Sequence, residues 1–264
     1  ANRFAQQEIL HSGCGKVEWL RGKYRTTSEA ITKNAITAII LLILRSFQRK
    51  GFKKMEKKYY ILQKQAYSIY PQVDCLSVFQ AQQISSWKIF SGIKPKLSFR
   101  LKKKAKFTDV LSSTAGPFTD FLISSKVKEI IDSSHVMQYQ FFEASIKTND
   151  QEYEYYWLHL SQPNLVDALN YEESEFYQTE WEFLNKGPIK IKSYEHYMKL
   201  KAKDEDGSFG VSLNKIVLKE NFDRSLDLFF LLPFDFNIYV SEGLKDKLES
   251  SGVTGISFSN SITF

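Results

Sequence analysis

The sequence contains few of the residues that cross-link or break a chain. Its 264 residues include 2 Cys, 12 Gly and 6 Pro. The two cysteines, Cys14 and Cys75, cannot form a disulfide framework, and their spacing is not that of a metal site. The low glycine and proline content excludes collagen-like and low-complexity architectures. The cysteine usage indicates an intracellular protein, or one that is indifferent to redox conditions.

Apolar runs long enough to enter a membrane are also missing. The run Ala35–Leu44 is ten residues long, whereas a spanning helix needs about twenty. Arg45 and further basic residues follow this run without a small-residue cleavage site, so the pattern is not that of a secretory signal. We therefore expect no membrane partner.

No catalytic or metal-binding pattern is recognisable. The patterns H-E-x-x-H, C-x-x-C and G-x-S-x-G and the phosphate loop do not occur. There are four histidines: His11, His135, His159 and His196. His159 alternates with Trp157 on an expected strand, where a histidine is more often a satisfied core residue than a general base. We expect a protein that is not an enzyme and uses no cofactor or metal.

The hydrophobic content of 43% and the charged content of 25% are those of a globular chain. The net charge of +6 is distributed unevenly. Residues 1–54 hold 11 Lys/Arg against three Glu, giving +8, whereas residues 55–264 sum to −2. The basic character of the chain therefore rests mainly on its first fifth.

The basic segment 1–54 is predicted to be a helical extension. Ser28 is a candidate N-cap for a helix over residues 28–50, which Gly51 would end. Met55 looks like a natural start that is followed at once by a strand. The interpretation we favour is that residues 1–54 are not part of the native domain, which then covers residues 55–264. The alternative is a genuine helical arm.

Deleting residues 1–54 is expected to leave a soluble, cooperatively folded protein, because the elements predicted for the core lie downstream. Thermal unfolding of the truncated chain measures this directly. Insolubility, or a loss of several degrees in melting temperature, would place the helix at 28–50 in the core instead.

From residue 55 onward the pattern mixes strands and helices. His135–Lys147 is predicted to be an aromatic-rich strand, and Glu152–Leu160 is predicted to be its return strand. Asn149 and Asp150 supply the turn residues between them. Together these features predict a β-hairpin.

An internal similarity links two segments that are 117 residues apart. Leu122–Phe141 recurs as Tyr239–Phe258, and six positions are identical. In each copy a strand leads to a serine, Ser124 or Ser241, that is expected to cap a helix, and a second strand follows. This predicts a β-rich α+β fold with two related strand–helix–strand modules. The alternative is two unrelated capped helices.

These features resemble a known group of proteins. The region of resemblance opens with Tyr59–Leu62, and between the two modules it contains Tyr156–Leu160, Ser174–Phe176 and Ile191–Glu195. Over about residues 55–264 it resembles the predicted immunity proteins of bacterial polymorphic toxin systems, first immunity protein family forty-three and second the related family eleven. The resemblance implies a cytoplasmic protein that binds and neutralises a cognate toxin. It implies no particular site residues.

Negative charge is concentrated in residues 149–182, which hold nine Asp/Glu, no Lys/Arg and eight aromatic residues. Such a surface suits a basic partner, because carboxylates steer the encounter while Tyr and Trp anchor it. The alternative is a solvated acidic face whose aromatic residues point into the core. The residues that we expect to bind the toxin are Asp150, Glu152, Glu154, Glu172, Glu173, Glu175, Tyr177 and Trp181.

A basic run supports an alternative function. Residues 94–106 contain seven positive charges: Lys94, Lys96, Arg100, Lys102, Lys103, Lys104 and Lys106. These could contact phosphates in a nucleic-acid-binding module. A run of this kind is more often an edge strand that uses lysine to prevent aggregation. We therefore expect a protein partner and regard nucleic acid as the less favoured one.

Overall fold

The structure is a computed structural model that describes residues 57–264, except residues 66, 78–84, 86, 114–118, 162–164 and 182–183 and the side chain of Ser261. The helix expected at 28–50 and the start expected at Met55 lie outside the described residues, as does Glu182 of the acidic segment. The described residues all belong to one compact unit.

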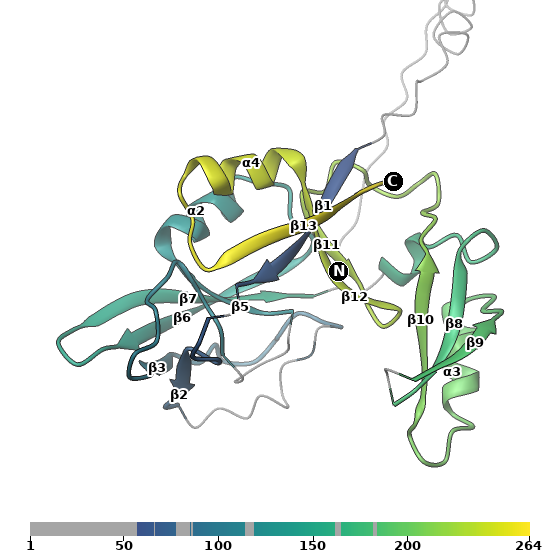
Figure 1. The fold of residues 1–264 in the computed structure, drawn as a ribbon, viewed down its shortest axis with the longest axis horizontal. Coiled ribbons are helices and arrows are strands. Elements are labelled where there is room, and N and C mark those ends of the chain that lie inside the picture. The colour runs from purple at the N-terminus through teal and green to yellow at the C-terminus, as the bar shows by residue number, and fades with distance from the viewer. Residues whose placement is uncertain are drawn as a thin grey trace, which may run out of the picture. The chain divides into compact units, whose positions relative to one another are not determined.

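Three β-sheets dominate the described part of the chain (Figure 1). The first sheet has the order β11-β12-β1-β13, formed by Leu228–Leu231, Asp235–Ser241, Lys58–Lys64 and Ile256–Thr263. The second has the order β2-β3-β6-β7-β5-β4, formed by Val73–Cys75, Leu97–Leu101, Tyr139–Lys147, Glu152–Leu160, Phe121–Ser124 and Val110–Leu111. The third has the order β10-β8-β9, formed by Phe209–Lys215, Glu175–Glu180 and Leu184–Ile189.

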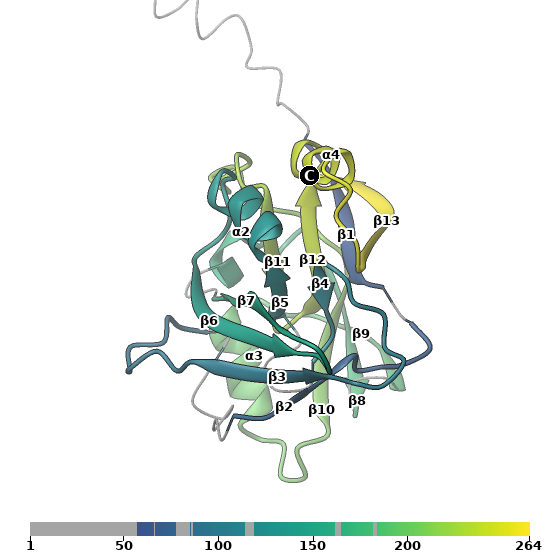
Figure 2. The same ribbon diagram turned by 90° about the vertical axis from the view of Figure 1, so that its left-hand side faces the viewer.

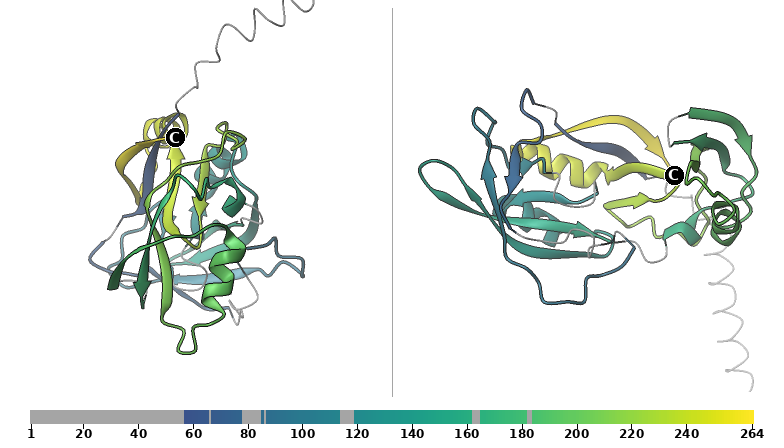
Figure 3. Two further views of the ribbon diagram at one scale, coloured as in Figure 1. Left: turned by 90° about the vertical axis from the view of Figure 1, so that its right-hand side faces the viewer. Right: turned by 90° about the horizontal axis from the view of Figure 1, so that it is seen from below.

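The helices described are few and short. They are α2, α3 and α4, which span Ser125–Asp132, Tyr194–Lys201 and Glu242–Ser250, and a 3-10 helix over Leu165–Ala168. The prediction of a β-rich α+β fold is therefore confirmed. In Figure 3, left, α3 lies beside the strand β10 of the third sheet.

The hairpin of β6 and β7 is confirmed. β7 covers the expected residues Glu152–Leu160 and pairs along its whole length with β6. Tyr155, Trp157 and His159 point from one face of β7 into the core, in keeping with the period of two. Leu158 on the other face is buried as well. The hairpin is therefore covered on both sides near the end of β7, whereas its turn is exposed.

Helix α3 is not among the elements predicted above, because the residues around 194–200 are also compatible with a strand or a turn. Ser193 supplies the missing start signal, because its Oγ accepts a hydrogen bond from the backbone N–H of His196 at 3.1 Å. Glu195 in the first turn and Lys201 in the last turn both complement the helix dipole. Tyr197 is buried and fastens the helix to the core.

The interpretation of the basic run as an edge strand is wrong. β3 lies inside its sheet, antiparallel to β2 on one side and parallel to β6 on the other. Part of its positive charge is neutralised, because Lys96 lies 3.1 Å from Glu143 and Lys102 lies 3.3 Å from Asp74. Lys96 and Lys102 therefore form ion pairs with neighbouring strands, and they do not protect an unpaired strand edge.

Two strand–helix–strand segments occur where the internal similarity places them: β5–α2–β6 and β12–α4–β13. The apolar side of each helix faces the core, with Val127 and Ile131 buried in α2 and Leu244 and Leu248 buried in α4. Helices α2 and α4 lie beside each other (Figures 1 and 2).

The two serines differ in what they bind. Ser241 caps α4 as expected, because its Oγ accepts from the N–H of Leu244 at 3.2 Å. The capping role expected for Ser124 is wrong, because its side chain makes no such bond. Its Oγ instead donates to the Asp109 carboxylate at 3.0 Å. A tertiary partner thus replaces the local one.

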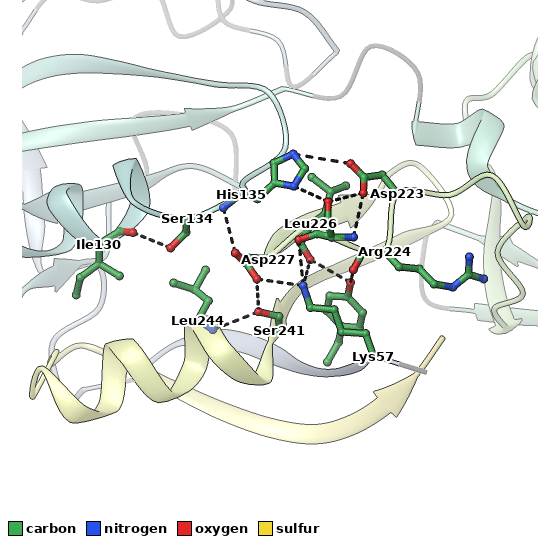
Figure 4. Close-up of polar contacts among 12 residues, drawn as sticks. Lys57, Ile130, Ser134, His135, Asp223, Arg224, Leu226, Asp227, Ser241 and Leu244 are labelled. Atoms are coloured by element: carbon green, nitrogen blue, oxygen red, sulfur yellow. Dashed lines mark hydrogen bonds and ion pairs between the residues drawn. The ribbon is translucent and has the colours of Figure 1, made fainter. Parts of the chain in front are cut away.

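Asp227 joins the start of one segment to the end of the other (Figure 4). Its carboxylate accepts from Ser241 Oγ at 2.6 Å and from the N–H of His135 at 3.0 Å. Ser241 precedes α4, whereas His135 follows α2. The ammonium of Lys57 lies 3.1 Å from the same carboxylate. Asp227 therefore connects the two segments by hydrogen bonds, and we call such a connecting aspartate a clasp.

Asp109 forms the reciprocal clasp. Its carboxylate accepts from Ser124 Oγ, which precedes α2, and from the N–H of Thr254, which follows α4, at 2.9 Å. The ammonium of Lys126 lies 3.1 Å away. Each aspartate thus binds the serine before one helix and the turn after the other helix, together with one lysine.

Replacing Asp227 by Asn is expected to lower the free energy of unfolding by about 1.5–3 kcal/mol at neutral pH, the range for hydrogen bonds to a charged group. Burial opposes ionisation of Asp227, but bonds from Ser241 and His135 and the charge of Lys57 outweigh it and lower the pKa below 3.8. The ionised form therefore stabilises the fold above that pH, and this stabilisation is lost as the pH falls through the lowered pKa.

Urea unfolding of the parent and Asp227→Asn proteins at several pH values checks this. The difference between them should shrink in acid. Asp74→Asn is the control, because Asp74 is a largely exposed partner of Lys102. An equal loss in both variants would contradict the clasp.

Candidate functional site

The expected toxin-binding residues fall into separate places. Asp150, Glu152 and Glu154 lie at and beside the β6–β7 turn, whereas Glu172, Glu173, Glu175 and Tyr177 belong to β8 and the turn before it. All six carboxylates are exposed. Figure 1 shows the β6–β7 turn at one end of the described unit and the third sheet at the other. The structure therefore places the residues of the second group close together, but it places the first group far from them.

The second group surrounds a hollow of about 690 Å³ on the third sheet. We call this the acidic hollow and define it by Glu172, Glu173, Glu175, Tyr177, Pro188, Lys190 and Asn214, which are among its lining residues. Three carboxylates and one ammonium line it, so the hollow is negative. A hollow of this charge attracts cationic groups.

The turn before β8 fixes the backbone of Glu172 and Glu173 and the carboxylate of Glu173. Asn170 Oδ1 accepts from the N–H groups of Glu172 and Glu173 at 3.2 and 3.4 Å, as in a turn stabilised by an Asn side chain. Asn170 Nδ2 in turn donates to the Glu173 carboxylate at 2.9 Å. The turn is tied to the core by Tyr171, whose hydroxyl donates to the carbonyl of Val166.

Alternation along β8 separates the core from the hollow. Phe176 is buried and packs against Phe234 and Tyr171, with ring centroids 5.4 and 5.8 Å away. Tyr177, the next residue, is half-buried beside Pro188 of β9. Glu175 is oriented by Asn214 of β10, whose amide donates to it at 3.1 Å. All three strands of the sheet therefore position the hollow.

Some aromatic residues of the acidic segment 149–182 point into the core, and others are accessible to a partner. Four of them are buried and belong to the core: Tyr155, Trp157, Tyr171 and Phe176. Three are half-buried: Tyr153, Tyr156 and Tyr177. Trp181 differs from all of these, because 52% of its surface is exposed.

Trp181 also has an unusual backbone. Its φ of 53° lies in the left-handed region, which is unfavourable for a bulky side chain. Its N–H donates to the carbonyl of Ser208 at 2.8 Å, which holds the strand end in this conformation. Strained, exposed residues of this kind are concentrated at functional sites.

A buried polar network was not predicted from the sequence. Asp120 is buried, and its carboxylate accepts from Trp157 Nε1 at 2.8 Å and lies 3.0 Å from His159 Nδ1. Burial disfavours the charged form of His159, but the hydrogen bond and charge of Asp120 outweigh it and raise the pKa of His159 above 6.5. His159 is thus a satisfied core residue, as the strand pattern indicated. In the sequence, the alternation with Trp157 is the one signal that indicated burial of His159. No signal in the sequence indicated that Asp120 is its partner.

His135 lies at the other polar cluster (Figure 4). Its Nδ1 is 2.7 Å from Ser225 Oγ, and its Nε2 is 3.8 Å from Asp223. The ammonium of Lys57 donates to the carbonyls of Ser225 and Leu226 as well as to Asp227. These hydrogen bonds and ion pairs connect distant segments of the chain, and none of the residues of this cluster lines the acidic hollow.

Among the described residues, no group of three or more His, Cys, Asp or Glu side chains could hold a metal ion. Within the same part of the chain, none of the helices has both the length and the apolar character needed to cross a membrane.

Comparison with protein families identifies the class of protein. The sequence model described as Immunity protein family (Imm11) matches residues 48–262. The chain therefore belongs to the Imm11 immunity protein family. This is the second of the two families that the sequence resembles, and the match begins at residue 48, inside the basic segment. No curated protein matches the chain significantly.

Proposed function

We propose that the protein binds and neutralises a cognate bacterial toxin in the cytoplasm without catalysing a reaction. Membership of an immunity protein family supports the toxin as partner. The observation that carries the choice of surface is the acidic hollow, in which Glu172, Glu173 and Glu175 converge beside Tyr177. Such a hollow fits a toxin domain with a basic surface.

The carboxylates act mainly on the encounter. Long-range attraction raises the association rate of oppositely charged proteins and disfavours partners of like charge. Asp150, Glu152 and Glu154 at the β6–β7 turn extend the negative field, and we propose that they steer the toxin. Tyr177 in the hollow and Trp181 at the end of β8 supply the apolar contact area of anchors.

Inhibition follows from occupancy. A toxin whose substrate is anionic, such as a nucleic acid, needs a basic cleft. The acidic hollow can then occupy the place of phosphate groups, and the toxin remains blocked while the complex persists. A stoichiometric inhibitor of this kind needs neither cofactor nor metal.

We also propose that the two clasped segments are copies of one unit. Six identical residue pairs support this, as do the reciprocal roles of Asp109 and Asp227. The third sheet, which carries the acidic hollow, lies between the copies in the sequence. The copies then form a scaffold, and the inserted sheet forms the recognition surface. Residues 1–54 would be dispensable for the scaffold and for the recognition surface.

The test uses a toxin domain encoded beside this gene, which is where we expect the cognate toxin. Light scattering after size-exclusion chromatography should detect a complex of defined stoichiometry, and co-expression should restore growth of cells that make the toxin. A protein that leaves the toxin unbound would overturn the proposal. Rescue by substoichiometric amounts with turnover would instead indicate an enzyme.

A further inference from the structure

A second hollow lies at the far end of β8 from the acidic hollow. It has a volume of about 340 Å³. We call it the aromatic hollow and define it by Trp181, Tyr197, Lys201, Phe209, Pro233 and Phe236, which are among its lining residues. β8 connects the two hollows, because Glu175 at its start lines the first and Trp181 directly after its end lines the second.

Two exposed aromatic side chains meet at this hollow from distant parts of the sequence. Trp181 is 52% exposed and Phe236, on β12, is 46% exposed. Exposed Trp and Phe side chains beside a hollow are typical of the central anchors of protein interfaces. The left-handed backbone of Trp181, held by the carbonyl of Ser208, keeps its ring at this position.

The wall beneath them is closely packed. Tyr197 is buried, and its ring centroid lies 5.0 Å from that of Phe234 and 6.3 Å from that of Phe209. These rings join α3, β10 and the β11–β12 turn into one packed cluster. The hollow is therefore formed before any ligand arrives, which reduces the ordering cost of binding.

The charge of this hollow is opposite to that of the first. Among the described residues that line it, Lys201 is the one that carries a charge, and its ammonium lies 5.9 Å from the Tyr197 ring centroid. The acidic hollow carries three glutamates instead. A group that fits the aromatic hollow is therefore apolar and has a carboxylate next to it.

The spacing allows one partner to contact both hollows. A six-residue strand such as β8 extends about 20 Å. A standard interface buries about 800 Å² on each partner, which is wide enough to include both ends of such a strand.

We propose that the aromatic hollow binds an apolar side chain of the toxin domain, flanked by a carboxylate that pairs with Lys201. This inference rests on the proposed function and names the second contact of the same interface. The acidic hollow then governs association, and the aromatic hollow governs how long the complex lasts. The toxin surface must accordingly place an apolar and acidic site about one strand length from a basic one.

The test measures association and dissociation rates of the full-length chain with the toxin domain encoded beside its gene. Phe236→Ser and Trp181→Asn are each expected to raise the dissociation rate by about tenfold or more, with the association rate changed by less than about threefold. Asn tolerates the left-handed backbone at position 181, so this variant keeps the local conformation. Two independent variants also guard against a folding defect in one of them.

Matched controls separate the hollow from the surface around it. Lys201→Glu should weaken binding by about tenfold, whereas Lys199→Glu on the same helix should not, because Lys199 is outside the hollow and pairs with Glu195. Ile93→Ser, at a 96% exposed residue away from the hollow, should also leave both rates unchanged.

The outcomes distinguish the two proposals. If the toxin binds the parent chain but Phe236→Ser and Trp181→Asn leave its dissociation unchanged, the aromatic hollow is no toxin contact, while the proposed function stands. If the parent chain does not bind the toxin, both proposals fail. A dimer of the free protein that Phe236→Ser abolishes would assign the hollow to a second copy and overturn the inference.

Discussion

Reversing Glu172, Glu173 and Glu175 to Lys is expected to slow association with the toxin by about tenfold to a thousandfold. All three carboxylates are exposed around the acidic hollow, so their charge acts on an approaching basic partner. Exposed charges contribute only about 0–1 kcal/mol each to stability, so the triple variant should stay folded, with the melting temperature lowered by roughly ten degrees or less. Stopped-flow association at several salt concentrations measures the effect, and the salt dependence should largely disappear.

A matched control reverses Glu129, Glu220 and Asp246, which are exposed residues of α2, the segment before β11 and α4. This changes the net charge equally but leaves both hollows intact. It should reduce the association rate far less. Equal slowing in both triple variants would mean that net charge alone matters.

Reversing Asp150, Glu152 and Glu154 should give slower association and weaker salt sensitivity, as expected for steering residues.

Replacing Asp120 by Ala is expected to lower the free energy of unfolding by about 3–5 kcal/mol, the cost of removing one partner from a buried charged pair. Asp120 and His159 are both buried, and the Trp157 Nε1–H would also lose its acceptor. Urea unfolding with coincident fluorescence and circular dichroism signals measures the loss. A change below about 1 kcal/mol would show that the network contributes little.

A double-mutant cycle with His159→Phe separates the pair from its surroundings. The double variant should lose less than the sum of the two single variants, because each single variant leaves a buried group unpaired. The pH dependence has a definite sign. Since the pKa of His159 is raised above 6.5, its protonated form stabilises the fold most below that pH. This stabilisation is lost as the pH rises through the raised pKa.

Local patterns of the sequence predicted the local elements. The β6–β7 hairpin follows from a period of two and from the turn residues Asn149 and Asp150, and both are properties of neighbouring residues. The spacing of Leu244 and Leu248, four residues apart, is likewise a local pattern that places both on one side of a helix. Helix α3 was missed although Ser193 gave a capping signal, because the aromatic residues around it are equally compatible with a strand.

Contacts between distant residues could not be predicted. Asp109 binds Thr254, which lies 145 residues further along the chain, and Asp227 binds His135, 92 residues before it. Ser124 fits a capping pattern, yet its hydroxyl binds Asp109 instead. The choice between a local and a tertiary acceptor depends on how the two segments pack, and the sequence does not encode that packing in any short motif.

The candidate site was predicted in its chemistry but not in its arrangement. The excess of carboxylates in residues 149–182 predicted exposed negative charge, and the six expected carboxylates are exposed. Their convergence depends on sheet pairing: β10 brings Asn214 to Glu175, and β9 brings Pro188 to Tyr177. Trp181 and Phe236 line the same hollow only because the end of β8 and the start of β12 lie beside it.

Growth rescue by the triple variant of Glu172, Glu173 and Glu175 tests the central claim most directly. Cells that make the neighbouring toxin domain would carry either the parent protein, this variant or the control variant of Glu129, Glu220 and Asp246, at equal levels of folded protein. We predict that the parent and the control protect the cells and that the hollow variant does not. Full protection by the hollow variant would contradict the claim that the acidic hollow binds the toxin.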